Sequence, residues 1–181
     1  MALTDLSDGP IRVLVSSCLL GEKVRYDGGH KRSAFLVETL GKRVQWIPVC
    51  PEVESGLPTP REPMLLAGDP ASPRLVAAKS GIDHTERVMN WAREWVRELA
   101  RLDLRGYVCK GNSPSCSGMG RIGVFGDAFG PARAGTGLFM MAFMERFPLV
   151  PVEEEERLRD PVLREIFLEK VFTLRRSDDS R

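Results

Sequence analysis

Short apolar runs with the character of strands alternate with helix-like segments along this chain. The run IRVLVSS at residues 11–17 alternates apolar side chains, and a second run at residues 44–49 follows a predicted short helix at residues 33–40. Further strands are predicted at residues 106–110 and 121–125. Strands that alternate with helices build a mainly parallel sheet that is covered on both faces. We therefore predict a single-domain α/β fold.

Helices are predicted from apolar spacing and from capping residues. The strongest prediction covers residues 84–103, where apolar residues recur every three or four positions. Asp83 is its expected N-cap, and Gly106 is expected to stop it. Another helix is predicted at residues 138–147, and a last one after the N-cap residue Asp160.

Composition and charge limit the functional classes. The chain of 181 residues is 43% hydrophobic and carries 26 basic and 25 acidic side chains, which leaves a formal charge of +1. The total charge therefore gives no indication of nucleic-acid or membrane binding, although it is compatible with a local basic patch. The first ten residues lack an apolar leader, and the longest apolar stretch, residues 137–144, is too short to span a bilayer. We predict a cytoplasmic protein without a membrane segment.

Three of the four cysteines follow predicted strands. Cys18 comes directly after the first strand, Cys50 directly after the second, and Cys116 lies in the loop behind the strand at residues 106–110. Because the carboxyl ends of parallel strands meet at one edge of a sheet, the three thiols are predicted to converge on one crevice. A cytoplasmic location disfavours disulfides between them, and the chain contains no CxxC pair.

Three converging thiols favour a metal cofactor over a set of buried free cysteines. A single buried cysteine behaves as a small hydrophobe, but loops rich in Gly, Pro and Ser form poor hydrophobic cores. Closed zinc sites take four ligands, often in close pairs that this chain lacks. Three separate thiolates suit an iron-sulfur cluster with one iron free of protein ligands, which would accept a soft substrate sulfur. Zinc held by three thiolates and a water is the alternative that the spacing leaves open.

Other residues near these cysteines each have two interpretations. Glu52 is either a surface carboxylate paired with Arg61 or a general acid or base beside the metal. Ser113 either begins a turn before Pro114 or orients a substrate oxygen or a water. Cys109 lies inside a predicted strand and is expected to be packed there rather than to bind metal.

Four further segments carry weaker expectations. Residues 50–63 contain four prolines and are predicted to form a loop that no helix or central strand crosses. The stretch GPARAGTG, residues 130–137, lacks the spacing of a phosphate-binding loop and is predicted to be a bend before a helix. The acidic run EEEERLRD, residues 153–160, is predicted to be solvated charge. Residues 25–27, Arg-Tyr-Asp, are expected to support the first loop or to bind an anionic substrate.

Three segments resemble the signature segments of the TudS-like thiouracil desulfidases. They are SSCLLGEKVRYDG, VCPEVESGLPTPR and KGNSPSCSG, and the resemblance covers residues 11–153. Three separated motifs in the same order make the resemblance specific. It implies a Rossmann-like domain that carries a 4Fe-4S cluster and removes sulfur from a thiolated uracil.

The resemblance also implies roles for individual residues. Cys18, Cys50 and Cys116 would bind the cluster and leave its fourth iron free of protein ligands. Glu52 would be the catalytic acid or base, and Ser113 would assist. The implied chemistry is non-redox: iron captures the thiocarbonyl sulfur, water activated by Glu52 adds to the carbon, and sulfide leaves on the cluster.

The end of the chain resembles longer relatives in which a second domain follows. We predict a desulfidase domain over residues 1–153 and a C-terminal helical extension over residues 154–181 that resembles the start of that second domain. Longer relatives are similar to desulfidases that act on 4-thiouridine in tRNA, and shorter ones to enzymes of free thiouracil, so the tRNA substrate is favoured. The competing hypotheses are a non-catalytic iron-sulfur module that binds RNA or acts as a sensor, and a zinc-dependent hydrolase on the same three thiolates.

Overall fold

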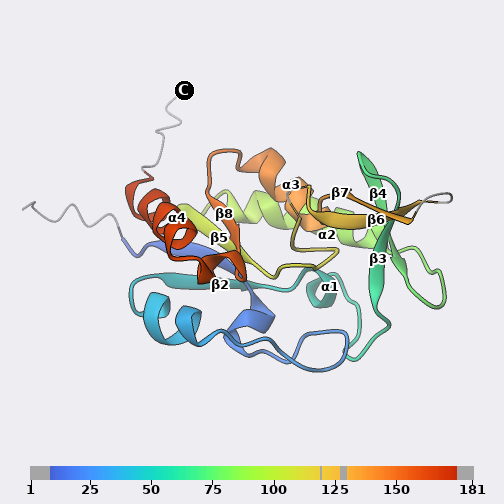
Figure 1. Cartoon of the computed structure of the whole chain (residues 1–181), viewed down its shortest axis with the longest axis horizontal. Coiled ribbons are helices and arrows are strands. Elements are labelled where there is room, and N and C mark those ends of the chain that lie inside the picture. Colours follow the sequence, from blue (N-terminus) through green and yellow to red (C-terminus); the bar gives the residue numbers. More distant parts are fainter. Residues whose placement is uncertain (1–8, 119, 127–129, 175–181) are drawn as a thin grey trace, which may run out of the picture.

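A parallel four-stranded sheet forms the centre of the fold. The computed structural model of the chain describes residues 9–118, 120–126 and 130–174. In sheet A the strand order is β2-β1-β5-β8, and every neighbouring pair is parallel (Figure 1). Its strands are β1 (Arg12–Ser16), β2 (Gln45–Val49), β5 (Leu104–Cys109) and β8 (Val152–Glu154). The predicted parallel α/β sheet is thereby confirmed.

Sheet A is buried on both faces because its central strands carry apolar side chains on both. Val13 and Val15 of β1 belong to one core together with Val108 of β5. Leu14 and Tyr107, which alternate with them, belong to the core on the opposite face. All five side chains are fully buried. Such continuous apolar runs are typical of parallel strands that are covered by helices.

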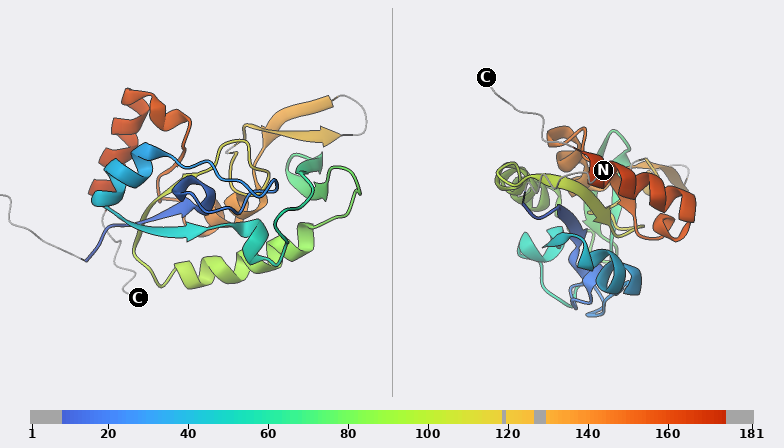
Figure 2. Two further views of the ribbon diagram at one scale, coloured as in Figure 1. Left: turned by 90° about the horizontal axis from the view of Figure 1, so that it is seen from below. Right: turned by 90° about the vertical axis from the view of Figure 1, so that its left-hand side faces the viewer.

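Helices cover both faces of sheet A, with α2 and α4 on opposite sides (Figure 2). Helices α2 and α3 pack together on one face, and α4 covers the other with several short helical turns. No helix within the described ranges has the length and apolar character needed to cross a membrane. The bounds are α2 (Thr85–Leu99), α3 (Leu138–Arg146), α4 (Pro161–Thr173), η1 (Ser17–Leu20), η2 (Phe35–Thr39), η3 (Leu40–Lys42) and η4 (Arg157–Arg159).

A second, mixed sheet is the largest feature that the sequence did not predict. Sheet B lies at the end of the molecule opposite α4 (Figure 1). It joins two antiparallel hairpins through parallel pairing of β3 with β6, where Leu66 is opposite Val124. Its strands are β3 (Met64–Asp69), β4 (Ser72–Ala77), β6 (Ile122–Gly126) and β7 (Gly130–Gly135).

The bend predicted at residues 130–137 is wrong, because most of this stretch forms β7. The strand order β4-β3-β6-β7 makes β7 an edge strand. An edge strand tolerates Pro131, since the missing N–H of proline is not needed by a further neighbour.

The proline-rich segment at residues 50–63 contains one helical turn, α1 (Pro51–Glu54), so the prediction of a loop without helix is wrong there. Proline is tolerated at the first helical position, where its N–H would have no intrahelical partner. The Glu54 carboxylate accepts a 2.8 Å hydrogen bond from the backbone N–H of Cys50 and so fixes the start of the turn. Gly56, with φ +93°, follows its end.

Helix α2 is confirmed, but its ends differ from the prediction. It runs from Thr85 to Leu99, and its N-cap is His84, so the prediction of Asp83 as N-cap is wrong. The Asp83 carboxylate nevertheless accepts a 2.8 Å hydrogen bond from the N–H of Thr85. Gly106 does not stop the helix, because it lies inside β5. A Cβ atom there would lie 2.8 Å from Val171 of α4, so this glycine allows α4 to pack closely on sheet A.

The N-cap predicted for α4 is confirmed. The Asp160 carboxylate accepts hydrogen bonds from the N–H groups of Val162 and Leu163 at 2.8 and 3.2 Å. Phe167 and Val171 are buried against sheet A. The segment predicted as a C-terminal extension therefore contributes to the core, while a domain boundary at residue 153 stays a prediction.

Candidate active site

The three cysteines that follow strands all line one cavity at the carboxyl edge of sheet A. The cavity has a volume of about 370 Å³. Cys18 lies in η1 after β1, Cys50 lies between β2 and α1, and Cys116 lies in the loop that follows β5. The structure thus brings together the thiols that the sequence predicted to converge.

Backbone hydrogen bonds hold the first two cysteines in place. The carbonyl of Cys18 accepts from the N–H groups of Gly21 and Lys31 at 3.3 and 2.9 Å. Gly21 has φ +104°, a conformation that glycine adopts without strain. Cys50 is fixed by Glu54 as described above, and its thiol lies 3.9 Å from the carbonyl oxygen of Val24. Both thiols are therefore presented by tight turns that immediately follow strands.

The third cysteine lies in a loop that we call the Cys116 loop, residues 110–118. The hydroxyl oxygen of Ser113 accepts from the N–H groups of Ser115 and Cys116 at 3.3 and 3.1 Å. The carbonyl of Ser113 accepts from the Ser117 hydroxyl at 3.1 Å. Ser113 also lines the cavity. The structure bears out the turn-forming interpretation of Ser113, and a role in catalysis stays a prediction.

Helix α3 begins directly on the Cys116 loop. The N–H groups of Leu138 and Phe139 donate to the carbonyls of Pro114 and Ser115 at 3.2 and 3.0 Å. These are N–H groups that a helix start leaves without an intrahelical partner. A Cβ atom on Gly137 would lie 2.6 Å from the Ser115 carbonyl oxygen, so only glycine permits this approach. The loop and the helix therefore fix each other.

The acidic run that begins in β8 braces the same loop, so its prediction as solvated charge is wrong for Glu154 and Glu155. The exposed residues of the run are Glu156, Arg159 and Asp160. Glu155 accepts a 2.6 Å hydrogen bond from the N–H of Gly111 and forms an ion pair with Lys110. Glu154 accepts from the N–H of Gly118 at 3.2 Å. The two glutamate side chains are only 11% and 13% exposed. The physical reason is that β8 pairs with β5, which places the acidic residues beside the loop that leaves β5.

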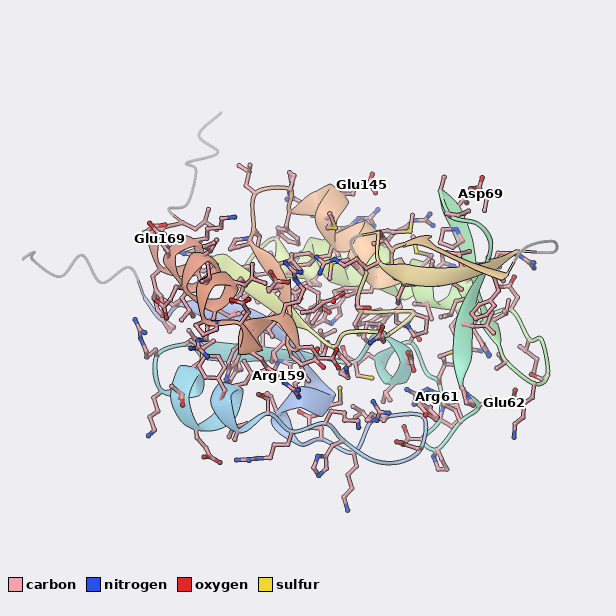
Figure 3. All side chains as sticks on the ribbon, in the orientation of Figure 1. Arg61, Glu62, Asp69, Glu145, Arg159 and Glu169 are labelled. Atoms are coloured by element: carbon pink, nitrogen blue, oxygen red, sulfur yellow. The ribbon has the colours of Figure 1, made fainter. Side chains whose placement is uncertain are left out.

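Glu52, in α1, lines the cavity with both carboxylate oxygens engaged. One oxygen, Oε2, accepts from Nε of Arg61 at 2.8 Å and also from Nη2 of the same guanidinium. The other, Oε1, accepts a 2.9 Å hydrogen bond from the Ser115 hydroxyl. The predicted pairing with Arg61 is confirmed, but the surface location is wrong, because the two side chains are 13% and 7% exposed. Figure 3 labels Arg61 in the loop that leads into β3.

Ser115 is the residue of this site that sequence reasoning missed. It is fully buried, and its hydroxyl is the serine hydroxyl that contacts Glu52. The available signal was the second serine of the segment Ser-Pro-Ser-Cys, directly before Cys116. The first serine of the segment, Ser113, was predicted to begin a turn, and it does so in the structure.

Arg25, Tyr26 and Asp27 form a local group at the cavity. Nε of Arg25 lies 3.4 Å from Asp27, and its guanidinium lies over the Tyr26 ring at 5.4 Å from the ring centre. The N–H of Gly29 donates to Asp27, which lowers the pKa of that carboxyl. Arg25 and Tyr26 line the cavity, so the expected support of the first loop and contact with a substrate are both compatible with their positions.

Cys109 is packed inside the sheet, as expected. Its side chain is fully buried in β5, and Sγ lies 3.6 Å from the carbonyl oxygen of Glu153 in the neighbouring strand. Burial raises the pKa of this thiol well above its usual value. The cavity is lined by the other three cysteines.

Burial favours the protonated form of all three cavity thiols. Burial raises the pKa of Cys18 to about 11, and it also raises the pKa of Cys50 and of Cys116. The thiols act on one another as well: Cys50 raises the pKa of both other thiols, which is a mark of their proximity. A cation is therefore needed to hold all three as thiolates.

The donor set fits an iron-sulfur cluster. Soft thiolates select iron-sulfur clusters and zinc among the common metal centres. In the part of the chain that the structure describes, no three Cys, His, Asp or Glu side chains meet closely enough to hold one metal ion. A cluster binds each cysteine through a different iron and does not require that convergence. A buried hydroxyl without a partner, that of Tyr107, lies in the same apolar core as Cys116.

Comparison with known proteins agrees with this donor set. The chain matches the 2-thiouracil desulfurase family over residues 13–155. It belongs to that family. The matched stretch contains all three cavity cysteines together with Glu52 and Ser113. The predicted membership of a thiouracil desulfidase family is thereby confirmed.

Two relatives of this member of the 2-thiouracil desulfurase family are informative. The chain is 33% identical over 109 residues to the uncharacterized protein YbbK of Bacillus subtilis (strain 168), which covers 58% of this chain and 72% of that protein. Its fold is similar to a solved structure of a 4Fe-4S-dependent thiouracil desulfidase, TudS (DUF523Vcz). The TM-score is 0.68 at 31% sequence identity, over 86% of this chain and 97% of that one.

Proposed function

We propose that this protein is an iron-sulfur-dependent desulfidase that replaces the sulfur of a thiolated uracil with oxygen. One observation carries the proposal: a single cavity brings Cys18, Cys50 and Cys116 together with the Glu52 carboxylate. Family membership and the likeness to a 4Fe-4S-dependent thiouracil desulfidase support it.

The proposed cofactor is a 4Fe-4S cluster held by Cys18, Cys50 and Cys116. Three protein ligands leave one of the four irons without a protein ligand. When bound, the cluster supplies a Lewis acid with affinity for a soft thiocarbonyl sulfur. All three thiols line one cavity, which supports this ligand set.

The proposed reaction consumes one water and transfers no electrons. The thiocarbonyl C=S becomes C=O, and the sulfur leaves as hydrogen sulfide. Glu52 is proposed to take one proton from the water as its oxygen adds to the ring carbon, and to give that proton to the sulfur as the C–S bond breaks. The second proton passes from the new hydroxyl to the released sulfur as the C=O bond forms, so the sulfur leaves as hydrogen sulfide. Arg61 and Ser115 hold the carboxylate in one orientation for this exchange. Ser113, whose hydroxyl lines the cavity, is proposed to orient the water.

The cavity also offers a surface for a pyrimidine ring. Tyr26 lines the cavity and is 41% exposed, so one face of its ring is accessible. Stacking on an aromatic side chain is a common way to hold a base without reading its edge. This supports a nucleobase as substrate.

A second cavity favours a substrate that carries phosphate, and hence 4-thiouridine in tRNA over the free base. It has a volume of about 610 Å³ and shares Lys31 and Lys110 with the first cavity. Figure 3 labels Arg159, which lines it just before α4. Two glutamates, Glu155 and Glu156, also contribute to the lining. The basic residues around it are Lys31, Arg32, Lys110, Arg159 and Arg164.

Sulfide release from two substrates tests the proposal. The protein is reconstituted anaerobically with iron and sulfide, and it is offered tRNA that contains 4-thiouridine or free 2-thiouracil. We expect the protein to release sulfide from at least one of these substrates, and we expect no release when iron is omitted from the reconstitution. Arg159→Ala should raise KM for the tRNA and leave KM for the free base unchanged, whereas the exposed Arg101→Ala should change neither. If the cluster-loaded protein releases sulfide from neither substrate, the proposed desulfidase activity is refuted and the non-catalytic iron-sulfur module is favoured.

A further inference from the structure

The hydroxyl of Tyr107 is buried without a hydrogen-bond partner. Tyr107 lies in β5 and is 0% exposed. Within the described residues, its oxygen is one of two fully buried side-chain polar atoms that no donor or acceptor reaches; the other is Nε1 of Trp46. Buried polar groups in native proteins are nearly always paired, so an unpaired hydroxyl calls for a specific explanation.

Packing does not explain the hydroxyl. The Tyr107 ring lies in an edge-to-face arrangement with Phe139, at 6.0 Å between ring centres, and its centre is 5.1 Å from that of Phe143. A phenylalanine would make the same ring contacts without burying an oxygen. The structure therefore retains a polar atom that costs stability in the protein by itself.

The Tyr107 hydroxyl lies close to two side chains that line the cavity, those of Ser16 and Cys116. Tyr107 shares its core with Cys116 and Cys109. A phenol keeps its proton at neutral pH, so this hydroxyl is able to donate a hydrogen bond. No hydrogen bond of normal geometry joins the Tyr107 hydroxyl to the side chain of Ser16 or of Cys116, and the Ser16 hydroxyl accepts a 3.0 Å hydrogen bond from the N–H of Lys110 instead.

We infer that the Tyr107 hydroxyl donates a hydrogen bond to the sulfur of Cys116 when the cluster is bound, and that Tyr107 is a positioning residue which sets the electronic properties of the cluster. The inference rests on the proposed cluster. A thiolate bound to iron accepts hydrogen bonds, and such bonds to the sulfurs help to set the reduction potential of a cluster. The reduced cluster carries more negative charge, so the hydrogen bond stabilises it more than the oxidised form.

Tyr107→Phe in the cluster-loaded protein is the test. We expect a more negative reduction potential for the cluster, measured by a potentiometric titration followed by electron paramagnetic resonance. We also expect that the shift of the iron-thiolate stretching band on transfer to D₂O, measured by resonance Raman spectroscopy, is smaller than in the wild type. Phe143→Leu is the matched control, because it changes the packing of the Tyr107 ring and keeps the hydroxyl. An unchanged potential and an unchanged D₂O shift in Tyr107→Phe would overturn the inference.

A second experiment covers the case in which Tyr107→Phe does not retain its cluster. The chain has two tyrosines, so 3-fluorotyrosine incorporated in a Tyr26→Phe background labels Tyr107 alone. The more acidic phenol is a stronger donor, so the potential should move in the positive direction relative to Tyr26→Phe. No movement would overturn the inference. Wild-type protein that binds no cluster would instead refute the proposed function, so the two failures are distinguishable.

Discussion

The hydroxyl of Ser115 donates a 2.9 Å hydrogen bond to Oε1 of Glu52. This bond connects α1, which follows β2, to the Cys116 loop, which follows β5. It joins the proposed proton-transferring group to the residue directly before a proposed cluster ligand. A change in the position of the loop therefore changes the position of the carboxylate.

Glu52→Gln should abolish most of the sulfide release while the cluster is retained. The amide keeps the shape of the side chain but cannot take up a proton, and general acid-base catalysis contributes about 10²- to 10⁴-fold. The measurement is the rate of sulfide release per cluster, with iron and sulfide content determined in parallel. Glu98→Gln, at an exposed ion pair, is the matched control and should keep the wild-type rate. Turnover near the wild-type rate in Glu52→Gln would contradict the proposed role.

Ser115→Ala and Ser113→Ala should differ in how much cluster they retain. Loss of the Ser115 hydroxyl frees one oxygen of Glu52, and we expect activity to fall by about tenfold with normal cluster content. Loss of the Ser113 hydroxyl removes two hydrogen bonds inside the Cys116 loop, worth about 1 kcal/mol each. It should lower stability and cluster retention, and also the rate of sulfide release per cluster, because this hydroxyl is proposed to orient the water. The same activity and cluster content in both variants would show that the two serines have equivalent roles, against this prediction.

Arg61→Ala should destabilise the protein strongly. It leaves the mostly buried Glu52 carboxylate without its cation, which costs about 3–5 kcal/mol of the free energy of unfolding. Adding Glu52→Gln should recover part of that loss, because the charge that lacked a partner is removed. Urea denaturation of the wild type, Arg61→Ala and the double variant, each without cluster, measures both effects. Equal stability of Arg61→Ala and the wild type would show that the pair is not buried in solution.

Glu155→Gln should weaken the brace under the Cys116 loop. The amide can still accept from the N–H of Gly111, but it loses the charge opposite Lys110, a residue that is 12% exposed. Lys110 keeps a second partner, Glu156 at 3.7 Å, so we expect a loss of about 2 kcal/mol in the free energy of unfolding, and faster loss of cluster iron to a chelator. Glu165→Gln, on an exposed position of α4, should change neither quantity. If Glu155→Gln loses cluster iron to the chelator at the wild-type rate, Glu155 does not stabilise the Cys116 loop.

The protein without cluster should lose stability between pH 9 and pH 11. The Cys18 thiol has a pKa of about 11 in the folded state, against an ordinary value near 9. The folded state thus binds the proton more tightly, so the stabilisation is complete below pH 9 and is lost as the pH rises to 11. For Cys18 alone this amounts to about 2–3 kcal/mol. Urea denaturation across this range should show a shallower decline in Cys18→Ala, and an identical decline would contradict the assignment.

Most of the candidate site could be predicted because its cysteines follow continuous apolar runs. Residues 11–17 and 44–49 have a strong local pattern, and the strands they predict end directly before Cys18 and Cys50. Cys116 follows β5 after a short loop, which the same reasoning places at the same edge of the sheet. To predict that the three cysteines lie at one edge of the sheet, the only further assumption is that their strands are parallel.

The strand predicted at residues 121–125 is confirmed as β6, but sheet B as a whole could not be predicted, because β3 and β7 have weak local patterns. β7 contains two glycines and a proline, and β3 ends in Gly68 and Asp69. Its two hairpins are joined where Leu66 pairs with Val124, positions that are distant in the sequence. A strand of this kind is stabilised by its partners more than by its own composition.

The sequence by itself determined the candidate residues for the chemistry, which are the three thiols at strand ends and the carboxylate of Glu52, and it determined the parallel α/β character of the fold. Only the tertiary structure decided what surrounds them. A run of glutamates has the local character of a solvated surface, and it becomes a brace because β8 pairs with β5. Ser115 and Tyr107 look like ordinary serine and tyrosine in the sequence. The roles proposed for them depend on residues of other elements, Glu52 for Ser115 and Cys116 for Tyr107. Contacts between residues that are distant in the sequence leave no trace in the local pattern of side chains.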